Sequence, residues 1–532
     1  MKTMTIHKPK STSRNHKIVS GTEAISKIKD GATVATGGFC GAGFAEDLAI
    51  YLEDRFITSH EPKDLTLLYC AGQGDYQTRG LNHLAYEGLV KKVIGGFFGA
   101  APKLVELVIQ NKIQAYNFPQ GVLSHMLRDI AAHKPRTITS VGLNTFVDPR
   151  REGGKANTIT KDDLVELIIF DDKEYLAYKT FPVDVALLRG TTADENGNVT
   201  MEKEALTLES QAMAMATKNS GGIVIVQVEG IASAGSLKPK DVKIPGILVD
   251  YVVVARLENH WQTFAEKYDP ALSGERKIQV AALPKMEMSA RKIIARRAAQ
   301  ELKPGQIVNL GIGMPEGISN IANEEEILDQ ITLTAEPGII GGLPCGGLSF
   351  GAGINPDAII DQPSQFDFYH GGGLDLAFLG LAQVDQEGNL NVSKFGVKMS
   401  GAGGFIDISQ NAKQLVFTGT FTAGNLAVSI QNGQLSIDQE GENCKFPKYV
   451  EQVTFSGLNA INTGRPVLYI TERCVFALGK KGLTLSEIAP GINLEEDILA
   501  RMEFKPEISD SLKLMDPILF QNEVMGLKEK FF

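Results

Sequence analysis

A single acid followed by a glycine-rich turn is the strongest candidate for chemistry in this sequence. Glu336 stands between the apolar, β-branched segment 331–335 and the turn 337–342. The segment predicts a strand covered on both faces, and Pro337 favours extended geometry for the residue before it. Glu336 is therefore expected at the carboxyl end of a strand, where ligands collect in open α/β sheets. A carboxylate there can act as a nucleophile, a base or an acceptor for a sugar hydroxyl, or it can be a solvated loop acid.

Two further groups of residues could assist such a carboxylate. Gln120 follows Pro119 at the predicted end of another strand, where its amide could donate to a developing oxyanion or belong to an ordinary turn. Lys398 and the glycines of segment 401–404 form a basic loop that could hold phosphate groups through backbone N–H groups. A solvated turn carrying Lys394 and Lys398 would need no ligand, so both interpretations stay open.

The loop 311–317 indicates an alternative chemistry, that of an NAD-dependent dehydrogenase. Its sequence GIGMPEG comes within one residue of the dinucleotide fingerprint GxGxxG, and Glu336 follows at the place of a ribose-binding acid. Pro315 inside the loop, Pro337 after the acid and the one additional residue all disfavour that function. We keep the dehydrogenase as an alternative hypothesis.

Two other motifs are interpreted as having no catalytic role. Segment 347–351 matches the nucleophile-elbow pattern GxSxG, but glycine-rich sequence surrounds it in place of the strand and helix that the motif requires. His370 has no second histidine or cysteine at metal-ligand spacing, so a packing or loop role is expected for it. The five cysteines form no CxxC pair, and no metal site is predicted.

Composition narrows the class of protein further. The chain has 532 residues, of which 43% are hydrophobic and 22% charged, so several well-packed globular domains are expected. A net charge of −10 argues against a nucleic-acid partner. The scattered cysteines favour a reducing compartment, the N-terminus has no apolar signal-peptide region, and the apolar runs are too short to cross a membrane. The sequence thus predicts a cytoplasmic protein with no membrane partner.

Repeated patterns predict two similar α/β domains. The order of helix, glycine, strand and glycine near residues 22–37 returns at 298–311, and a strand followed by a Gly-Asn hairpin occurs at both 183–198 and 374–389. We expect two open α/β domains with the active site in the cleft between them.

The predicted boundaries follow from where these patterns stop. They are a polar tail at 1–16, an N-terminal domain at 17–267, a linker at 268–290 and a C-terminal domain at 291–532. The elements predicted most clearly are helices at 22–28, 45–52 and 291–302, and strands at 32–36, 65–69 and 331–335.

These stretches together resemble the family I coenzyme A transferases over nearly the whole chain. The N-terminal half is similar to the family's α-type subunit at 37–43 and 119–121, and the C-terminal half to the β-type subunit at 309–315, Glu336, 371–375, Lys398 and 403–404. The segment 365–373 and the single-chain length look closest to the acetate and propionate type. Many members carry Glu-Asn-Gly or Glu-Thr-Gly at the nucleophile, whereas this chain has Glu-Pro-Gly, which leaves the loop geometry open.

The resemblance implies a ping-pong transfer of CoA through a glutamyl-CoA thioester on Glu336. It implies that Gln120 stabilises oxyanions, with help from Gly37, Gly38 and Phe39 or from Gly341 and Gly342. The residues expected to contact CoA are Gly311, Gly313, Met314, Lys398, Gly403 and Gly404. Phe39, Phe118 and Met314 are expected to line a pocket for a small apolar acyl group.

The resemblance also implies the partners. They are a short-chain acyl-CoA and a free carboxylic acid in the range of acetate, propionate, butyrate and acetoacetate, with CoA as substrate and product and no permanently bound cofactor or metal. A homo-oligomer, either a dimer or a tetramer, is the family expectation. An acyl-CoA thioesterase and a non-catalytic ligand sensor stay open as alternatives, although no DNA-binding module is evident.

Overall fold

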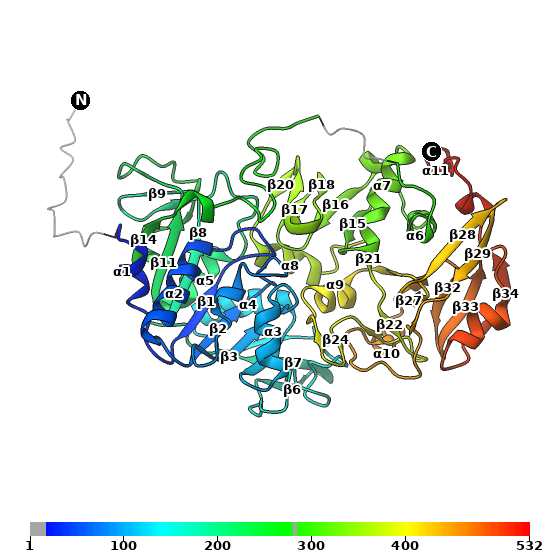
Figure 1. The fold of residues 1–532 in the computed structure, drawn as a ribbon, viewed down its shortest axis with the longest axis horizontal. Coiled ribbons are helices and arrows are strands. Elements are labelled where there is room, and N and C mark those ends of the chain that lie inside the picture. Colours follow the sequence, from blue (N-terminus) through cyan, green and yellow to red (C-terminus); the bar gives the residue numbers. More distant parts are fainter. Residues whose placement is uncertain (1–16, 280–284, 532) are drawn as a thin grey trace.

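The computed structural model describes residues 17–279 and 285–531, and it contains two large sheets that lie side by side along the long axis of the molecule (Figure 1). The first sheet has seven strands, all parallel, in the order β14-β11-β8-β1-β2-β3-β4. Its strands are β1 (Thr33–Thr36), β2 (Leu65–Tyr69), β3 (Val90–Gly95), β4 (Gln114–Asn117), β8 (Val185–Arg189), β11 (Ile223–Val228) and β14 (Tyr251–Val254).

The second sheet has ten strands and mixed directions, in the order β20-β17-β16-β15-β21-β26-β31-β32-β33-β34. Its strands are β15 (Ile307–Leu310), β16 (Thr332–Ala335), β17 (Ile339–Ile340), β20 (Ala358–Ile359), β21 (Leu376–Gly380), β26 (Gln414–Thr418), β31 (Val467–Ile470), β32 (Cys474–Gly479), β33 (Gly482–Ile488) and β34 (Glu507–Leu514). The central strands from β16 to β31 are parallel, and antiparallel strands extend the sheet on both sides.

Helices cover both faces of the first sheet, which explains why its strands are nearly continuous apolar runs. The neighbours Leu67 and Leu68 in β2 are both buried, but they point into two different hydrophobic clusters. One cluster contains side chains of α1 (Gly21–Ile25), α2 (Glu46–Ser59) and α3 (Pro102–Ile109), and the other contains side chains of α4 (Gln120–Ala131) and α5 (Ser210–Asn219). Each fully buried leucine of this kind contributes about 1.5–3 kcal/mol to folding.

The helices and the remaining strands complete the element list. The α-helices are α1 (Gly21–Ile25), α2 (Glu46–Ser59), α3 (Pro102–Ile109), α4 (Gln120–Ala131), α5 (Ser210–Asn219), α6 (Ala290–Ala299), α7 (Gly317–Glu324), α8 (Gln362–His370), α9 (Phe405–Asn411), α10 (Gly457–Asn462) and α11 (Leu527–Phe531). The smaller sheets pair β5 (Arg136–Thr139), β6 (Val165–Phe170) and β7 (Lys173–Lys179), and separately β9 (Thr192–Asp194), β10 (Val199–Thr200), β12 (Gly230–Ala232) and β13 (Val242–Ile244). The two-stranded pairs are β18 (Leu343–Pro344) with β19 (Gly353–Ile354), β22 (Gln383–Val384) with β23 (Leu390–Asn391), β24 (Lys394–Phe395) with β25 (Lys398–Met399), β27 (Thr422–Ala423) with β30 (Asn443–Cys444), and β28 (Ala427–Gln431) with β29 (Gln434–Gln439).

The predicted α/β class is confirmed, and the predicted elements are present with shifted ends. The strand predicted at 65–69 is β2, and the one predicted at 331–335 is β16, which begins one residue later. The helix predicted at 45–52 continues to Ser59 as α2, while the helix predicted at 291–302 ends at Ala299 as α6. The two predicted hairpins are the antiparallel pairs β9–β10 and β22–β23.

The exact domain boundaries stay a prediction. The first sheet is built between Thr33 and Val254 and the second between Ile307 and Leu514. Part of the predicted linker packs against the C-terminal half, because the carbonyl of buried Ala271 accepts a hydrogen bond from the Asn355 N–H at 3.0 Å. The predicted tail at 1–16 and linker residues 280–284 lie outside the described residues.

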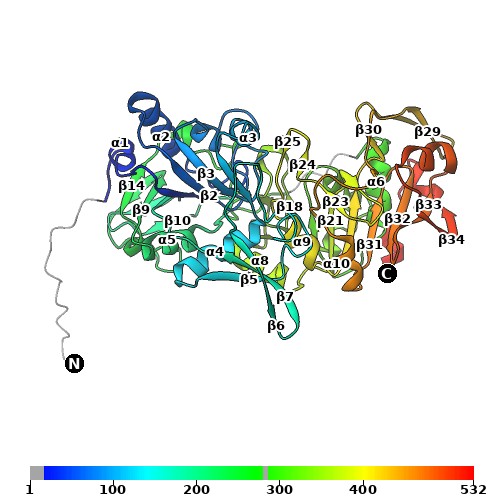
Figure 2. The same ribbon diagram turned by 90° about the horizontal axis from the view of Figure 1, so that it is seen from below.

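Two helices of the C-terminal half lie where the two halves meet. α8 and α9 contact each other, and both contact α4 of the N-terminal half, as the views in Figure 1 and Figure 2 show. Across the described residues, every helix is too short or too polar to span a lipid bilayer.

Candidate active site

A cavity of about 320 Å³ lies between the two halves, at the carboxyl ends of strands from both sheets. From the N-terminal half it is lined by Phe39, Cys40, Gly72, Tyr76, Phe97 and Gln120. From the C-terminal half it is lined by Asn309, Leu310, Gly311, Ile312, Ala335, Glu336, Pro337, Phe350, Leu379, Gly380, Val392, Ser400, Gly401, Ala402, Gly403, Gly404, Phe405 and Ile408. This is the position at which parallel α/β sheets place ligands.

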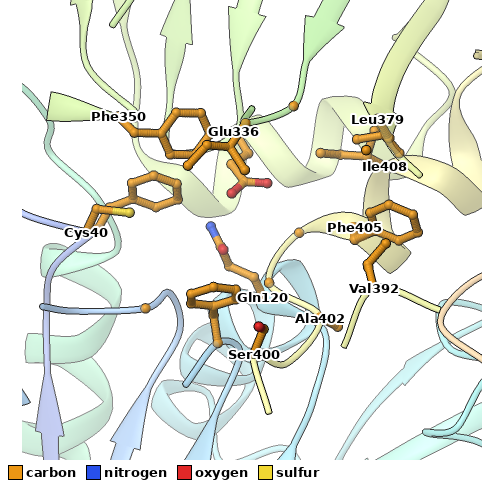
Figure 3. Close-up of a pocket in the computed structure, with 18 of the residues that line it drawn as sticks. Cys40, Gln120, Glu336, Phe350, Leu379, Val392, Ser400, Ala402, Phe405 and Ile408 are labelled. Carbon is orange, nitrogen blue, oxygen red and sulfur yellow. The ribbon is translucent and has the colours of Figure 1, made fainter. Parts of the chain in front are cut away.

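Glu336 follows β16 directly, as predicted, and its carboxylate points into the cavity (Figure 3). The turn after it is fixed by backbone contacts: the Gly338 N–H donates to the Ala335 carbonyl at 3.1 Å, and the Ile360 N–H donates to the Gly338 carbonyl at 2.9 Å. Gly338 has φ +122°, and a Cβ there would lie 2.0 Å from the Ile360 carbonyl oxygen. Only glycine fits this corner without a shift of the backbone.

Pro337 also has a defined place in the cavity wall. A Cβ on Gly351 would lie 2.4 Å from the Phe39 ring and 3.2 Å from Cγ of Pro337, so the three residues pack closely together. The Phe39 ring is 5.7 Å from the ring of Phe350. The proline that departs from the family pattern is thus part of an apolar wall beside Glu336.

Gly404 lies against the Glu336 carboxylate from another segment of the chain. A Cβ on Gly404 would lie 2.0 Å from Oε2 of Glu336. A Gly404→Ala variant is therefore expected to displace the carboxylate and to lower kcat by about tenfold, since misplacement of a reacting group is costly. Steady-state kinetics check this, and Gly230→Ala is the matched control because Gly230 has no positive φ and no atom lies within 4 Å of the Cβ it would add. Equal kcat for Gly404→Ala and the wild type would contradict the contact.

Burial raises the pKa of Glu336 to about 8, and the negative charge of Asp407 adds to the shift. An acid in an apolar site keeps its proton because the ionised form loses hydration there. If the ionised form of Glu336 reacts, kcat/KM falls about tenfold per pH unit below this pKa and levels off above it. A pH profile of kcat/KM with an acidic limb near pH 8 is the expected result. An acidic limb near pH 4.5 would show that the Glu336 carboxylate is exposed to water in the free enzyme.

Cys40 is a second potential nucleophile in the cavity, and its sulfur lies near Glu336 in Figure 3. Burial and the charge of Glu336 raise the pKa of the Cys40 thiol to about 12. The thiolate is the reactive form of cysteine, so this thiol is inert at neutral pH. Glu336 is the better candidate.

Gln120 begins α4 in the N-terminal half, and its amide points towards the Glu336 carboxylate (Figure 3). Its backbone N–H donates to the Gly403 carbonyl at 3.0 Å. Its side-chain Nε2 donates to Oε1 of Gln362 at 3.2 Å, which fixes the orientation of the amide. An amide nitrogen carries two hydrogens, so one remains for a group in the cavity.

The other predicted residues separate into two groups. Phe39, Gly311, Gly403 and Gly404 line the cavity together with Glu336 and Gln120. The residues predicted for the site that do not line it are Gly37, Gly38, Gly313, Met314 and Lys398.

The surroundings of this second group explain their positions. The Gly37 N–H donates to the Leu187 carbonyl at 3.4 Å, and the Gly38 carbonyl accepts from the Gln73 amide at 3.3 Å. Met314 packs against the core of the C-terminal half, and Lys398 is exposed in β25. Whether Gly37, Gly38, Gly313, Met314 or Lys398 contacts CoA stays a prediction.

Three other residues that were expected at the active site lie outside the cavity. The Gly341 N–H donates to the Leu333 carbonyl at 2.8 Å, and Gly341 and Gly342 line a different surface cavity, so this pair is not an oxyanion donor at Glu336. Phe118 is completely buried in the core of the N-terminal half and does not line the cavity.

The structure agrees with the interpretation of the two remaining motifs. Ser349 lies in a short 3-10 helix, and its hydroxyl hydrogen-bonds Oγ1 of Thr263 at 2.8 Å, so the GxSxG match is accidental. His370 hydrogen-bonds Asp407 at 2.8 Å. In residues 17–279 and 285–531, no group of three potential ligands could hold a metal ion.

An apolar wall on the side of the cavity opposite Phe350 was not predicted from the sequence. It consists of Leu379, Val392, Phe405 and Ile408, which lie together on one side of Glu336 in Figure 3. Leu379 and Ile408 are 4% and 2% exposed and resemble ordinary core residues of a strand and a helix. No sequence signal distinguishes a cavity wall from a core of the same residue types.

Comparisons with known proteins identify relatives of the chain over nearly its whole length. The family model for coenzyme A transferase matches residues 18–255. The chain is 49% identical to a caffeate CoA-transferase of Acetobacterium woodii, over 96% of this chain and 98% of that protein. It is 46% identical to the acetate CoA-transferase YdiF of Escherichia coli, over 96% of each chain.

A solved structure extends the likeness to the whole fold. The acyl-CoA transferase YdiF from E. coli O157:H7, described as a thioester complex with CoA, superposes with a TM-score of 0.91 at 44% identity, covering 96% of this chain and 97% of that one. This agreement excludes the dehydrogenase and ligand-sensor alternatives. The chain therefore belongs to the single-chain family I coenzyme A transferases and is an enzyme that transfers CoA between an acyl-CoA and a free acid.

Proposed function

We propose that the enzyme transfers CoA by a ping-pong mechanism in which Glu336 carries the group between the two substrates. The observation that carries the proposal is the opposition of two side chains in one cavity: a buried carboxylate from the C-terminal half and the amide of Gln120 from the N-terminal half. A carboxylate supplies the nucleophile and an amide N–H stabilises the oxyanion. Thioester exchange needs no net redox change and no metal.

The first half-reaction has two steps. The ionised Glu336 attacks the carbonyl carbon of the acyl-CoA, and the CoA thiolate leaves to give an acyl-glutamyl anhydride. The thiolate then attacks the glutamyl carbonyl of this anhydride, which releases the donor acid as a carboxylate and leaves a glutamyl-CoA thioester. An acceptor carboxylate reverses both steps and departs as the new acyl-CoA. The description of the relative's structure as a thioester complex with CoA supports this intermediate.

Each tetrahedral intermediate in these steps carries a negative oxygen that needs a donor. We propose that the remaining N–H of the Gln120 side chain donates a hydrogen bond to this oxygen. The other N–H is bound by Gln362, which fixes the orientation of the amide. The apolar walls exclude water, which protects the anhydride from hydrolysis. CoA itself is proposed to run past Gly311, Gly403 and Gly404, with Gly313, Met314 and Lys398 nearer its nucleotide.

An exchange assay tests the proposed function directly. Labelled acid incubated with unlabelled acyl-CoA should yield labelled acyl-CoA, and initial rates at several fixed acceptor concentrations should give parallel double-reciprocal lines. Loss of acyl-CoA at the same rate with and without an acceptor acid would replace the transferase by a thioesterase. Intersecting lines would show a ternary complex and overturn the covalent route.

The substrates are proposed to be short-chain acids in the range of acetate to butyrate and acetoacetate. The cavity of about 320 Å³ with apolar and aromatic walls supports a small acyl group. We expect kcat/KM for propionate to exceed that for caffeate by at least about tenfold, since a group too large for its pocket costs about 1–3 kcal/mol. Competition between the two acids for one acyl-CoA donor measures the ratio. A ratio that favours caffeate would contradict the proposed range.

Two properties of the protein as a whole complete the proposal. We propose a cytoplasmic enzyme, supported by five free cysteines that form no disulfide. We also propose a homo-oligomer, a dimer or a tetramer, with no permanently bound cofactor. Cell fractionation and light scattering of the purified protein test these points.

A further inference from the structure

Asp407 is a fully buried carboxylate in α9 that the chemistry above does not use. Its Oδ2 accepts a hydrogen bond from the Gly121 N–H at 3.1 Å, and its Oδ1 accepts one from Nε2 of His370 at 2.8 Å. Gly121 follows Gln120 in α4 of the N-terminal half, whereas Gly404 beside Glu336 immediately precedes α9. Asp407 therefore contacts the element that carries Gln120 and belongs to the element that touches Glu336.

We propose, on the basis of the proposed function, that Asp407 is a positioning residue that holds the Gln120 amide in register with Glu336 across the boundary between the two halves. It does not touch the reacting atoms. It acts through the backbone of α4, because the N–H that it binds belongs to the residue directly after Gln120. An oxyanion donor helps only when it is aimed at the reacting oxygen before the reaction begins.

The packing around this contact leaves little freedom for α4 to slide. A Cβ on Gly121 would lie 2.6 Å from Oδ1 of Asp407 and 2.5 Å from the Phe366 ring. The Gln120 N–H donates to the Gly403 carbonyl at 3.0 Å, and the Gly403 N–H donates to the Gly96 carbonyl at 2.7 Å. Backbone bonds thus hold the two segments together, and the Asp407 side chain locks the first turn of α4 against α9.

The charges near Asp407 come from several elements. His370 in α8 donates to it, and the His370 ring packs against the ring of His125 at 4.9 Å between centroids. His125 lies 3.0 Å from Asp367, and burial together with His370 lowers the pKa of His125. Tyr178, whose pKa is raised by burial and by Asp407, faces it from β7, and Glu336 faces it from the cavity.

Two variants of Asp407 separate the hydrogen bond from the charge. Asp407→Asn keeps an acceptor for the Gly121 N–H but removes the charge, and Asp407→Ala removes both. We expect Asp407→Ala to lower kcat about 30-fold with KM for acyl-CoA within about threefold of the wild type. Asp407→Asn should keep kcat within about fivefold. In both variants the acidic limb of the kcat/KM profile should move to lower pH, because a negative charge near Glu336 is gone.

The control is Asp385→Asn, which removes the charge of another buried aspartate. Asp385 lies in a hairpin that does not line the cavity, where it accepts hydrogen bonds from the Glu387 and Asn389 N–H groups at 3.0 Å. It should keep the wild-type kcat and pH limb. Equal losses of kcat in the folded Asp407→Asn and Asp407→Ala proteins would overturn the inference. If Asp407→Ala does not fold, a loss of kcat well above fivefold in Asp407→Asn overturns it, because that variant keeps an acceptor for the Gly121 N–H. A wild-type enzyme without acceptor-dependent transfer would instead overturn the proposed function.

Discussion

Replacement of Glu336 by glutamine is expected to lower kcat by on the order of 10⁴-fold or more, because an amide forms neither the anhydride nor the CoA thioester. The side chain keeps its shape, so the fold should remain intact. Wild-type stability should fall as the pH rises from the ordinary glutamate pKa of about 4.5 towards the pKa of about 8 in the folded state, since folding then requires a buried proton to be retained. The variant has no such group and should melt at a higher temperature than the wild type at pH 9.

Transfer assays and thermal melts check both parts of this prediction. Glu495→Gln is the control, because Glu495 is an exposed glutamate near the C-terminus. It should keep wild-type kcat and wild-type dependence of stability on pH. Turnover by Glu336→Gln above about one hundredth of the wild-type rate would remove Glu336 from the covalent role.

Replacement of Gln120 by alanine is expected to lower kcat about 10²- to 10³-fold, which corresponds to the loss of one oxyanion donor worth about 3–4 kcal/mol. The amide is 1% exposed and held by Gln362, so its removal takes away a donor with a fixed orientation. KM for the acyl-CoA should change much less than kcat, because the donor acts mainly on the transition state.

Steady-state kinetics with a saturating acceptor acid measure the changes in kcat and in KM for the acyl-CoA separately. Gln110→Ala is the matched control, since Gln110 ends α3 in the same half and pairs with Glu106 at the surface. A Gln120→Ala enzyme with less than a tenfold loss of kcat, or with a loss confined to KM, would contradict the oxyanion role.

The position of the central residue could be predicted because local rules are strong there. The β-branched segment before Glu336 and the proline after it are enough to place the acid at a strand end. The repeated strand and hairpin pattern likewise indicates two α/β halves. These features depend on residues that are close together in the chain.

The rest of the site could not be predicted because it depends on long-range packing. Gly121 and Asp407 are 286 positions apart, and no periodicity links them. Leu379 and Ile408 have the residue types of a core, so only the folded chain shows that they line a cavity. Lys398 is exposed in β25 and does not line the cavity, so its contact with the nucleotide part of CoA stays a prediction.

The extra strands of the second sheet were also missed. β32 is antiparallel to both of its neighbours, β31 and β33, and the alternation of helix and strand in the sequence does not predict such an extension. The repeated patterns predict two similar halves, whereas of the two large sheets only the first is entirely parallel.

The most direct test of covalent catalysis is the intact mass of the enzyme after addition of acyl-CoA, followed by borohydride reduction and peptide mapping. The proposal predicts a mass increase equal to CoA less one water, which disappears on addition of an acceptor acid, and a reduced residue in the peptide that contains Glu336. An unchanged mass in an enzyme that still exchanges acyl groups, or an adduct on Cys40, would contradict it.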